Sequence, residues 1–337
     1  MNNLKILVTG GAGFIGSHFV KLALKKSEVR QVINLDKLTY AGNPATLKPV
    51  EEDPKYQFIK GDIADASLID TVFKNGIDMV VNFAAETHVD RSIQEAGDFI
   101  KTDIQGVWVL LEACRRYGIK KFIQISTDEV YGSIAEGSFT ETAPLMPSNP
   151  YSASKAGGDR LAYSYWKTYQ LPVVVTRCSN NYGPYQYPEK LIPLFVTNAL
   201  ENKKLPLYGD GLNRRDWIHV LDHCEAVWFL TEKGENGETY NIAGRNELTN
   251  LVLTRMILDE FNLDPSMIQP VKDRPGHDRR YAIDDSRLRK LGWTSQIPFE
   301  KGLKETLQWY KENTAWWEPI KHGEFKQYYQ QQYGAIS

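Results

Sequence analysis

The feature that most constrains this chain is a glycine-rich turn directly after its first apolar run. Leu4–Val8 is mostly apolar, and Thr9–Gly16 reads T-G-G-A-G-F-I-G, so that Gly10, Gly13 and Gly16 have G-x-x-G-x-x-G spacing. Glycines permit a tight turn and a close approach of the backbone to a pyrophosphate, and a helix that follows supplies free N–H groups. The segment therefore predicts a strand, a phosphate-binding turn and a helix.

The first half of the chain alternates apolar runs with amphipathic segments of helical spacing. Continuous apolar runs are typical of strands that are buried on both faces of a parallel sheet. This alternation predicts an α/β fold with a doubly wound parallel sheet of the Rossmann type. We expect strands at Leu4–Val8, Val32–Leu35, Phe58–Ile59, Met79–Phe83, Phe122–Ile125 and Val173–Val175, and helices at Phe14–Lys26, Ala66–Lys74, Phe99–Tyr117 and Tyr151–Tyr169.

The pattern changes beyond about residue 177, where frequent prolines break the chain into shorter pieces. We therefore expect residues 1–177 to form the Rossmann-type domain. Residues 178–337 are expected to form mainly a smaller mixed α/β domain for a substrate, with one or two segments returning to the main sheet. Helices are expected there at Ile192–Glu201, Leu221–Thr231, Leu248–Glu260 and Leu303–Lys311.

An acidic residue stands where a dinucleotide-binding turn requires one. Asp36 ends the second apolar run, roughly 20 residues after the glycine turn, and its carboxylate can accept hydrogen bonds from an adenosine ribose. Its charge would repel a 2′-phosphate, so NAD is favoured over NADP, although Lys37 beside it moderates this preference. Asp62 and Ile63, after the third predicted strand, are placed to meet the adenine ring.

Two neighbouring clusters carry the chemistry. Tyr151 and Lys155 share one face of a helix, and a nearby ammonium favours the phenolate of tyrosine, a base towards an alcohol. Thr127, Asp128 and Glu129 follow the fifth predicted strand, at the edge where parallel sheets bind ligands. A simple dehydrogenase has no use for the two carboxylates, whereas a dehydratase needs an acid for the leaving hydroxyl and a base for the carbon proton.

The overall composition excludes several classes of partner. The formal net charge is −2, so no basic surface is available for a nucleic-acid backbone. No apolar stretch approaches the length of a membrane span. The three cysteines stand singly, without metal-ligand spacing, so we expect reduced thiols, no metal and a cytoplasmic protein.

Together these motifs resemble those of the dTDP-glucose 4,6-dehydratases, which are extended short-chain dehydrogenases/reductases, over nearly the whole chain. The matching segments are Thr9–His18, Asp36–Asn43, Ala84–Ser92, Ser126–Gly132, Pro150–Lys155, Arg177–Gln186, Pro188–Pro193, Arg215–Trp217 and Asp273–Tyr281.

The resemblance implies a lyase that retains its NAD. Tyr151 would take the proton of the C4 hydroxyl as its hydride passes to NAD, while Thr127 hydrogen-bonds that oxygen. Glu129 would then remove the C5 proton, Asp128 would protonate the departing C6 hydroxyl, and the hydride would return to C6. The product would be the 4-keto-6-deoxy sugar nucleotide.

The resemblance also implies two sets of binding residues. The cofactor would be bound by Gly10, Gly13, Phe14, Ile15, Gly16, Asp36, Lys37, Thr39, Asp62, Ile63, Ala84, Ala85, Thr102, Tyr151, Lys155 and Asn181. The nucleotide sugar would be bound by Thr87, Thr127, Asn180, Lys190, Leu191, Pro206, Tyr208, Arg215, Asn250, Arg274, His277 and Tyr333.

Two departures from the family pattern stand out. Thr87 replaces the usual serine, which keeps a hydroxyl but leaves less room, and the segment 132–143 is shorter than in many relatives. The related enzymes pair two helices across a dimer. We therefore expect a homodimer formed by Phe99–Tyr117 and Tyr151–Tyr169, whose additional apolar residues include Trp108, Leu111, Leu161, Tyr165 and Trp166.

Three alternatives stay open at this point. The substrate could be UDP- or CDP-glucose, because the motifs are less specific for the nucleotide base. A nucleotide-sugar 4-epimerase would share Tyr151 and Lys155 but has no use for Asp128 and Glu129. A non-catalytic NAD-sensing regulator would be expected to have lost the tyrosine or the acid pair, and all three residues are present.

Overall fold

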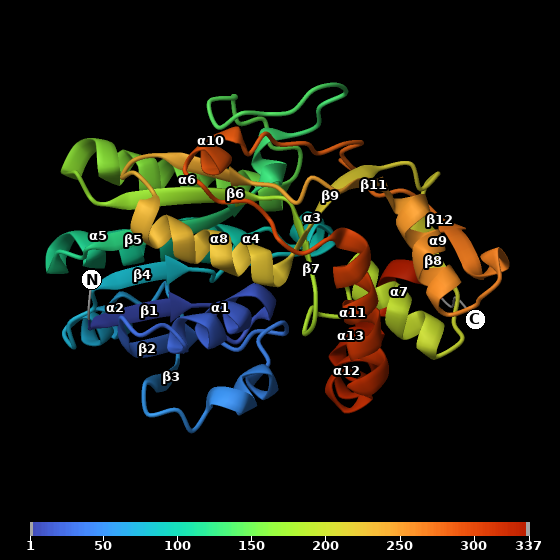
Figure 1. Cartoon of the computed structure of the whole chain (residues 1–337), viewed down its shortest axis with the longest axis horizontal. Coiled ribbons are helices and arrows are strands. Elements are labelled where there is room, and N and C mark those ends of the chain that lie inside the picture. Colours follow the sequence, from blue (N-terminus) through green and yellow to red (C-terminus); the bar gives the residue numbers. More distant parts are fainter. Residues whose placement is uncertain (1–2, 335–337) are drawn as a thin grey trace.

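The computed structural model describes residues 3–334, and its centre is a seven-stranded parallel sheet (Figure 1). The strand order β10-β6-β5-β4-β1-β2-β3 places β4 in the middle, and the order in which successive strands are added to the sheet reverses between β1 and β4. The doubly wound α/β fold is thereby confirmed. The strands are β1 (Leu4–Thr9), β2 (Val29–Asp36), β3 (Tyr56–Lys60), β4 (Met79–Asn82), β5 (Lys121–Thr127), β6 (Val173–Cys178) and β10 (Thr239–Ile242).

Helices cover both faces of this sheet, which explains why the inner strands β1 and β4 are mainly apolar and buried. Ile6 and Val8 of β1 point into a core with α1 (Phe14–Leu24) and α8 (Val220–Lys233), whereas Leu7 points into a second core on the opposite face. This second core contains residues of α2 (Ala66–Phe73), α5 (Val107–Tyr117) and α6 (Pro150–Tyr169).

The helix expected at 99–117 is interrupted by a π-helical turn. Helix α4 (Gly97–Ile100) continues into a π-helical segment (Lys101–Gly106) and then into α5. The turn buries the side chains of Thr102 and Asp103, and such turns frequently occur at functional sites.

Most of the second half of the chain forms a smaller α/β region at one end of the main sheet (Figure 1). It contains a three-stranded sheet, a parallel two-stranded pair and a third apolar core around Tyr182, Phe195 and Trp317. The strands are β7 (Asn180–Tyr182), β8 (Leu205–Tyr208), β9 (Arg214–His219), β11 (Glu247–Thr249) and β12 (Ile268–Val271), and the main helices are α7 (Leu191–Leu200), α9 (Asn250–Glu260), α11 (Phe299–Glu312), α12 (Thr314–His322) and α13 (Glu324–Tyr333).

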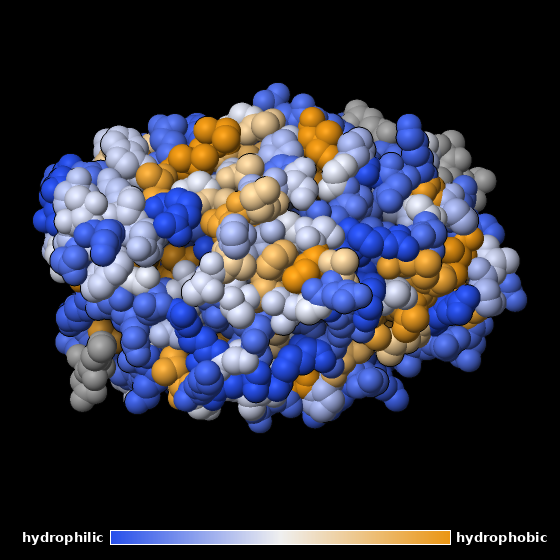
Figure 2. Space-filling model, turned by 90° about the horizontal axis from the view of Figure 1, so that it is seen from above, coloured by the Kyte–Doolittle hydropathy of each residue, from blue (hydrophilic) through white to orange (hydrophobic). Residues whose placement is uncertain are grey.

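Several elements of the second half pack on the main sheet, among them β10 and α8. Strand β10 pairs in parallel with β6 at its edge, and α8 packs against α1. On the face shown in Figure 2, apolar side chains lie in several separate groups among polar ones. Within residues 3–334, none of the helices combines the length and the apolar character that a membrane span requires.

Candidate active site

The glycine turn forms the floor of a pocket at the carboxyl end of β1. Gly10 has a φ of +69°, which favours glycine, and a Cβ on Gly16 would lie 2.2 Å from the Gly10 carbonyl oxygen. Helix α1 begins after Gly13, whose lack of a side chain leaves the first N–H groups uncapped. These free donors and the helix dipole suit a phosphate group.

Asp36, at the end of β2, is held in place by two backbone amides. Its carboxylate accepts hydrogen bonds of 2.8 Å from the N–H groups of Ala12 and Leu38. Burial raises the pKa of Asp36, and both hydrogen bonds oppose that effect. Lys37 forms an ion pair of 3.1 Å with Asp62, so its charge is engaged elsewhere. The edge of the pocket therefore fits an unphosphorylated ribose, as in NAD.

One pocket brings together every residue that the sequence predicted for the cofactor. Its lining runs from the glycine turn, along the ends of β1, β2, β4 and β5, to α6 and β7. The predicted residues that line it are Gly10, Gly13, Phe14, Ile15, Gly16, Asp36, Lys37, Thr39, Asp62, Ile63, Ala84, Ala85, Thr102, Tyr151, Lys155 and Asn181.

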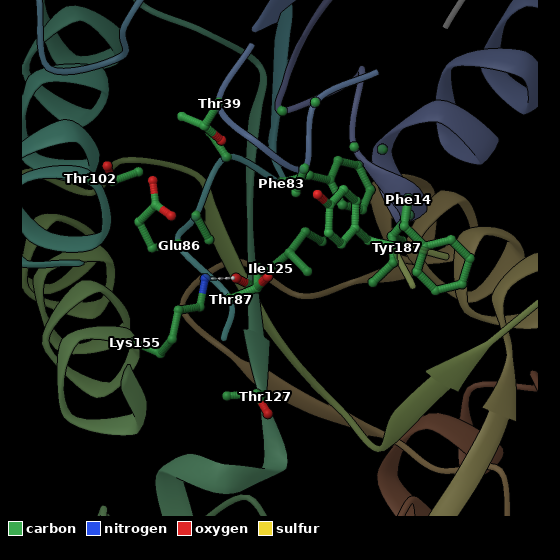
Figure 3. A pocket seen from close by; sticks show the side chains of 18 of the residues that line it. Phe14, Thr39, Phe83, Glu86, Thr87, Thr102, Ile125, Thr127, Lys155 and Tyr187 are labelled. Atoms are coloured by element: carbon green, nitrogen blue, oxygen red, sulfur yellow. Dashed lines mark hydrogen bonds between the residues drawn. The ribbon is translucent and has the colours of Figure 1, made fainter. Parts of the chain in front are cut away.

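Tyr151 and Lys155 face this pocket from the first turns of α6. Asn149 begins the helix with a capping box, in which its side chain accepts a hydrogen bond from Ser152 N–H and the Ser152 hydroxyl accepts one from Asn149 N–H. The Lys155 ammonium donates a 2.8 Å hydrogen bond to the Ile125 carbonyl of β5 (Figure 3). Burial raises the pKa of Tyr151 well above its ordinary value, and a hydrogen bond with Thr127 opposes that effect.

The acid pair lies in a short 3₁₀ turn (Asp128–Tyr131) directly after β5. The Thr127 hydroxyl caps this turn by accepting a 3.2 Å hydrogen bond from Glu129 N–H, and it donates one of 3.2 Å to Asp128. Asp128 is buried, and this burial, together with the charge of Glu129, raises its pKa well above its ordinary value. Glu129 is only partly buried. The two carboxyl groups therefore have different environments, as an acid and a base in one site require.

Four of the residues predicted for the sugar and phosphates also line the pocket: Thr87, Thr127, Asn180 and Lys190. The Lys190 ammonium donates a 2.7 Å hydrogen bond to the Thr87 carbonyl, and burial lowers the pKa of Lys190. The side-chain oxygen of Asn180 is buried and accepts no hydrogen bond from the described residues. A cation and an unused amide thus lie beside the acid pair.

A second group of predicted residues gathers outside this pocket, around the buried carboxylate of Asp90. Tyr208 donates a hydrogen bond of 3.2 Å to Asp90, and Arg274 donates one of 3.3 Å. The rings of His277 and Tyr333 lie 6.0 Å from that of Tyr208. An aromatic and cationic cluster of this kind suits a nucleoside diphosphate.

Arg215 connects the two groups of residues. Its guanidinium lies 4.2 Å from the ring of Tyr281, whose hydroxyl donates a 3.4 Å hydrogen bond to Glu129. The remaining three predicted residues do not line the pocket: Leu191 opens α7, Pro206 lies in β8, and Asn250 begins α9. Asn250 is nevertheless buried, and its side-chain oxygen accepts no hydrogen bond within the described part of the chain.

The sequence-based site omitted several polar residues that the structure places there. Glu86 points into the pocket beside Thr102 (Figure 3), and burial, with repulsion from Asp103, raises the pKa of Glu86 to about 7. Asp90 and Tyr281 were also missed. All three residues belong to segments that matched the family motifs, so the motifs were the one signal that could have identified them. Their contacts with distant segments could not be read from the sequence.

Comparison with known proteins gives consistent results. A family model described as GDP-mannose 4,6 dehydratase matches residues 7–306. The chain is 52% identical over 323 residues to the dTDP-glucose 4,6-dehydratase of Streptomyces niveus, which covers 94% of this chain and 96% of the relative.

Solved structures extend the comparison. The dTDP-glucose 4,6-dehydratase DesIV of Streptomyces venezuelae, solved with NAD bound, superimposes with a TM-score of 0.92 at 52% identity and covers 94% of this chain and 100% of that one. The UDP-glucose 4-epimerase of Thermotoga maritima has a TM-score of 0.85 at 31% identity, with 92% and 100% coverage. With its acid pair, its glycine turn and these relatives, this chain belongs to the dTDP-glucose 4,6-dehydratase family.

Proposed function

We propose that this protein converts dTDP-glucose to dTDP-4-keto-6-deoxy-glucose with NAD as a retained cofactor. The observation that carries the proposal is the position of Asp128 and Glu129, which lie in the same pocket as Tyr151 and Lys155. This arrangement provides a base for an alcohol and a separate acid and base for the loss of water.

The described residues would act in a fixed order. When bound, NAD accepts the hydride of C4 and returns it to C6. Tyr151 removes the proton of the C4 hydroxyl, and Lys155 stabilises the phenolate. The resulting ketone acidifies C5, so Glu129 can remove its proton, and Asp128 gives a proton to the departing C6 hydroxyl.

The acid pair favours a dehydratase over a 4-epimerase. A 4-epimerase needs only the alcohol oxidation and its reversal, for which Tyr151 and Lys155 suffice. Burial favours the protonated form of Asp128, which is the form that a general acid needs in order to protonate a leaving group. An epimerase would gain nothing from the cost of burying this carboxyl group.

The proposal is tested by mass spectrometry of the purified protein incubated with dTDP-glucose in deuterated water. We expect loss of one water and gain of one deuterium at C5. Parallel reactions with UDP- and CDP-glucose test which nucleotide base the enzyme accepts in its substrate. Conversion of UDP-glucose alone would overturn dTDP as substrate, and a 4-epimer without water loss would overturn the dehydratase.

We also propose that the two halves of the chain bind different ligands. Residues 1–177 would hold the cofactor, and residues 178–337 mainly the nucleotide sugar, with β10 completing the main sheet. The cluster around Asp90 supports this division, because Tyr208, Arg274 and His277 all come from the second half. The three cysteines are free and buried, as expected in a reducing compartment, which supports a cytoplasmic enzyme.

We further propose a homodimer, with a smaller apolar contact than the sequence suggested. Leu111 and Tyr165 are buried inside the chain, in the core between α5, α6 and the sheet, so they cannot form a surface as expected. Trp108 and Tyr163 remain exposed on α5 and α6, which pack against each other. Sedimentation equilibrium tests this: Trp108→Glu should give monomers, and Val252→Glu, at an exposed position of α9, should leave the dimer intact.

A further inference from the structure

A buried arginine joins helix α6, which carries the proposed base, to the 3₁₀ turn that carries the acid pair. Arg177, near the end of β6, is only 2% exposed. Its Nε donates a 2.9 Å hydrogen bond to Asp159, and its Nη1 donates one of 2.8 Å to the Tyr131 hydroxyl. Asp159 lies on α6, about one turn after Lys155, and Tyr131 is the last residue of the 3₁₀ turn. A single guanidinium group therefore contacts both elements of the proposed site.

The side chain of Tyr131 is held from several sides. Its hydroxyl accepts the hydrogen bond from Arg177 and donates its single proton to Oδ1 of Asn241 on β10, at 2.8 Å. The Asn241 amide is itself fixed, because its nitrogen donates to the carbonyl groups of Phe139, at 3.0 Å, and Asp284, at 3.1 Å. The ring of Tyr131 stacks on that of Phe139, with 5.2 Å between the ring centres. These contacts leave Tyr131 one position.

The position of the acid pair depends on the 3₁₀ turn as a whole. Oδ2 of Asp128 has no partner among the described residues, and the Thr127 hydroxyl holds only the start of the turn. In a 3₁₀ helix the side chains at positions i and i+3 lie above one another, so the direction of Tyr131 is linked to that of Asp128, three residues before it. The far end of the turn is held by the contacts of Tyr131 with Arg177 and Asn241.

We propose that Tyr131 and Arg177 are positioning residues for the elimination of water. Neither residue lines the pocket, so both act through the turn that they hold. Oxidation at C4 needs the base on α6 and the cofactor, and it makes no use of the acid pair. Elimination needs the acid pair to reach C5 and C6 of a sugar whose C4 oxygen is still held at α6, so this step depends on the distance between the helix and the turn. The proposal rests on the proposed function, because a 4-epimerase has no such second step.

The test measures the two steps separately in Tyr131→Phe, which removes the hydroxyl but keeps the ring that stacks on Phe139. dTDP-xylose has no C6, so C4 oxidation is the one step it can undergo, and the absorbance of the reduced cofactor reports it. This rate should be the same in Tyr131→Phe and in the unmodified enzyme. Water loss from dTDP-glucose, followed in a single turnover by rapid quench and mass spectrometry, should slow about 5- to 10-fold, the effect of one hydrogen bond. Reduced cofactor should accumulate during that turnover.

A second variant and a control separate this role from general stability. Arg177→Lys keeps the charge, but one ammonium group cannot replace both Nε and Nη1, so it should slow water loss selectively as well. The double variant should eliminate water no more slowly than the slower single variant, because both changes break one link. Tyr240→Phe is the matched control: Tyr240 is buried on β10, and its hydroxyl accepts a 3.0 Å hydrogen bond from Glu235 N–H. It should lower the midpoint of urea unfolding and leave both rates unchanged.

Three results would overturn the positioning role. Equal slowing of C4 oxidation and water loss in Tyr131→Phe would show that the hydroxyl supports the fold and not the elimination step. An unchanged rate of water loss in that variant would show that the hydroxyl has no part in the reaction, and additive slowing in the double variant would show that Tyr131 and Arg177 act separately. Failure of the proposed function is distinguishable, because the unmodified enzyme would then remove no water from dTDP-glucose.

Discussion

The hydroxyl of Tyr281 lies 3.4 Å from the Glu129 carboxylate and 2.8 Å from that of Asp278, and its single proton can be donated to either of them. This contact connects the segment before α10 (Ser286–Lys290) to the turn after β5 that contains Asp128 and Glu129. Tyr281 is buried and positions the carboxylate that would remove the C5 proton.

Removing this hydroxyl should slow the elimination selectively. We expect Tyr281→Phe to lower kcat about 5- to 10-fold, the effect of losing one hydrogen bond, with NAD affinity unchanged. The rate of deuterium entry at C5 should fall by the same factor. Tyr169→Phe, at the exposed end of α6, should change neither quantity. A fall in NAD affinity in Tyr281→Phe would contradict a role confined to Glu129.

Substitution of Glu129 and substitution of Asp128 should block different steps of the reaction. Glu129→Gln should lower the rate of water loss at least about 100-fold and leave the enzyme stalled as the bound keto sugar, with reduced cofactor visible by absorbance. Asp128→Asn should also slow water loss but continue to exchange the C5 proton for deuterium. Identical behaviour of both variants would contradict separate roles.

The stability of the cofactor-free protein should depend on Glu86. Burial, followed by repulsion from Asp103, raises the pKa of Glu86 from 4.5 to about 7. The folded protein thus binds this proton more tightly than the unfolded chain, so the stability contribution is present below pH 4.5 and is lost as the pH rises to about 7. At pH 8, Glu86→Gln should raise the free energy of unfolding by about 1–3 kcal/mol.

Urea unfolding at several pH values checks this prediction. The advantage of Glu86→Gln should shrink as the pH falls and disappear below pH 4.5, where the carboxyl of Glu86 is protonated in both the folded and the unfolded state. Glu136→Gln, in an exposed loop, should have little effect at any pH. A constant advantage across the pH range would show that packing, not charge, is responsible.

Within the glycine turn, substitution of Gly16 by alanine should be more damaging than substitution of Gly13. A Cβ on Gly16 would lie 2.2 Å from the Gly10 carbonyl oxygen, whereas one on Gly13 would lie 3.2 Å from the same atom. We expect Gly16→Ala to destabilise the fold by about 1–3 kcal/mol and to abolish detectable NAD binding, with Gly13→Ala affected less. Calorimetric titration measures the NAD affinity of both variants. Equal affinities would contradict the close approach of Gly16 to the Gly10 carbonyl oxygen.

Much of the main sheet was predictable because its signals are local. The apolar runs and the glycine turn each predict their own element, and the sheet then brings Asp36, Thr127 and Tyr151 to one edge. The π-helical turn at Lys101–Gly106 was not predictable, since no residue in the expected helix marks it. Strands β7, β8, β9, β11 and β12 were missed because they have only three to six residues and depend on distant partners.

In the site, too, contacts between distant parts of the chain could not be predicted from the sequence. The family motifs predicted a set of cofactor residues that line one pocket, but not that Asp90 would contact Tyr208 and Arg274, which lie more than 100 residues away in the sequence. The apolar stripe on α5 and α6 was misread in part, because periodicity does not distinguish a helix face that packs on its own chain from one that meets a second copy. Leu111 and Tyr165 belong to the first kind.

The most direct test of the central claim is the fate of the hydrogen at C4. dTDP-glucose carrying deuterium at C4 is mixed with dTDP-glucose that has ordinary hydrogen at C4 and ¹³C in the sugar, and the products are examined by mass spectrometry and NMR. The account predicts that the deuterium appears at C6 of the same molecule, without crossing to the ¹³C-labelled product. Loss of the deuterium to solvent, its return to C4, or its appearance in the ¹³C-labelled product would contradict a dehydratase that oxidises, eliminates and reduces within one closed cycle.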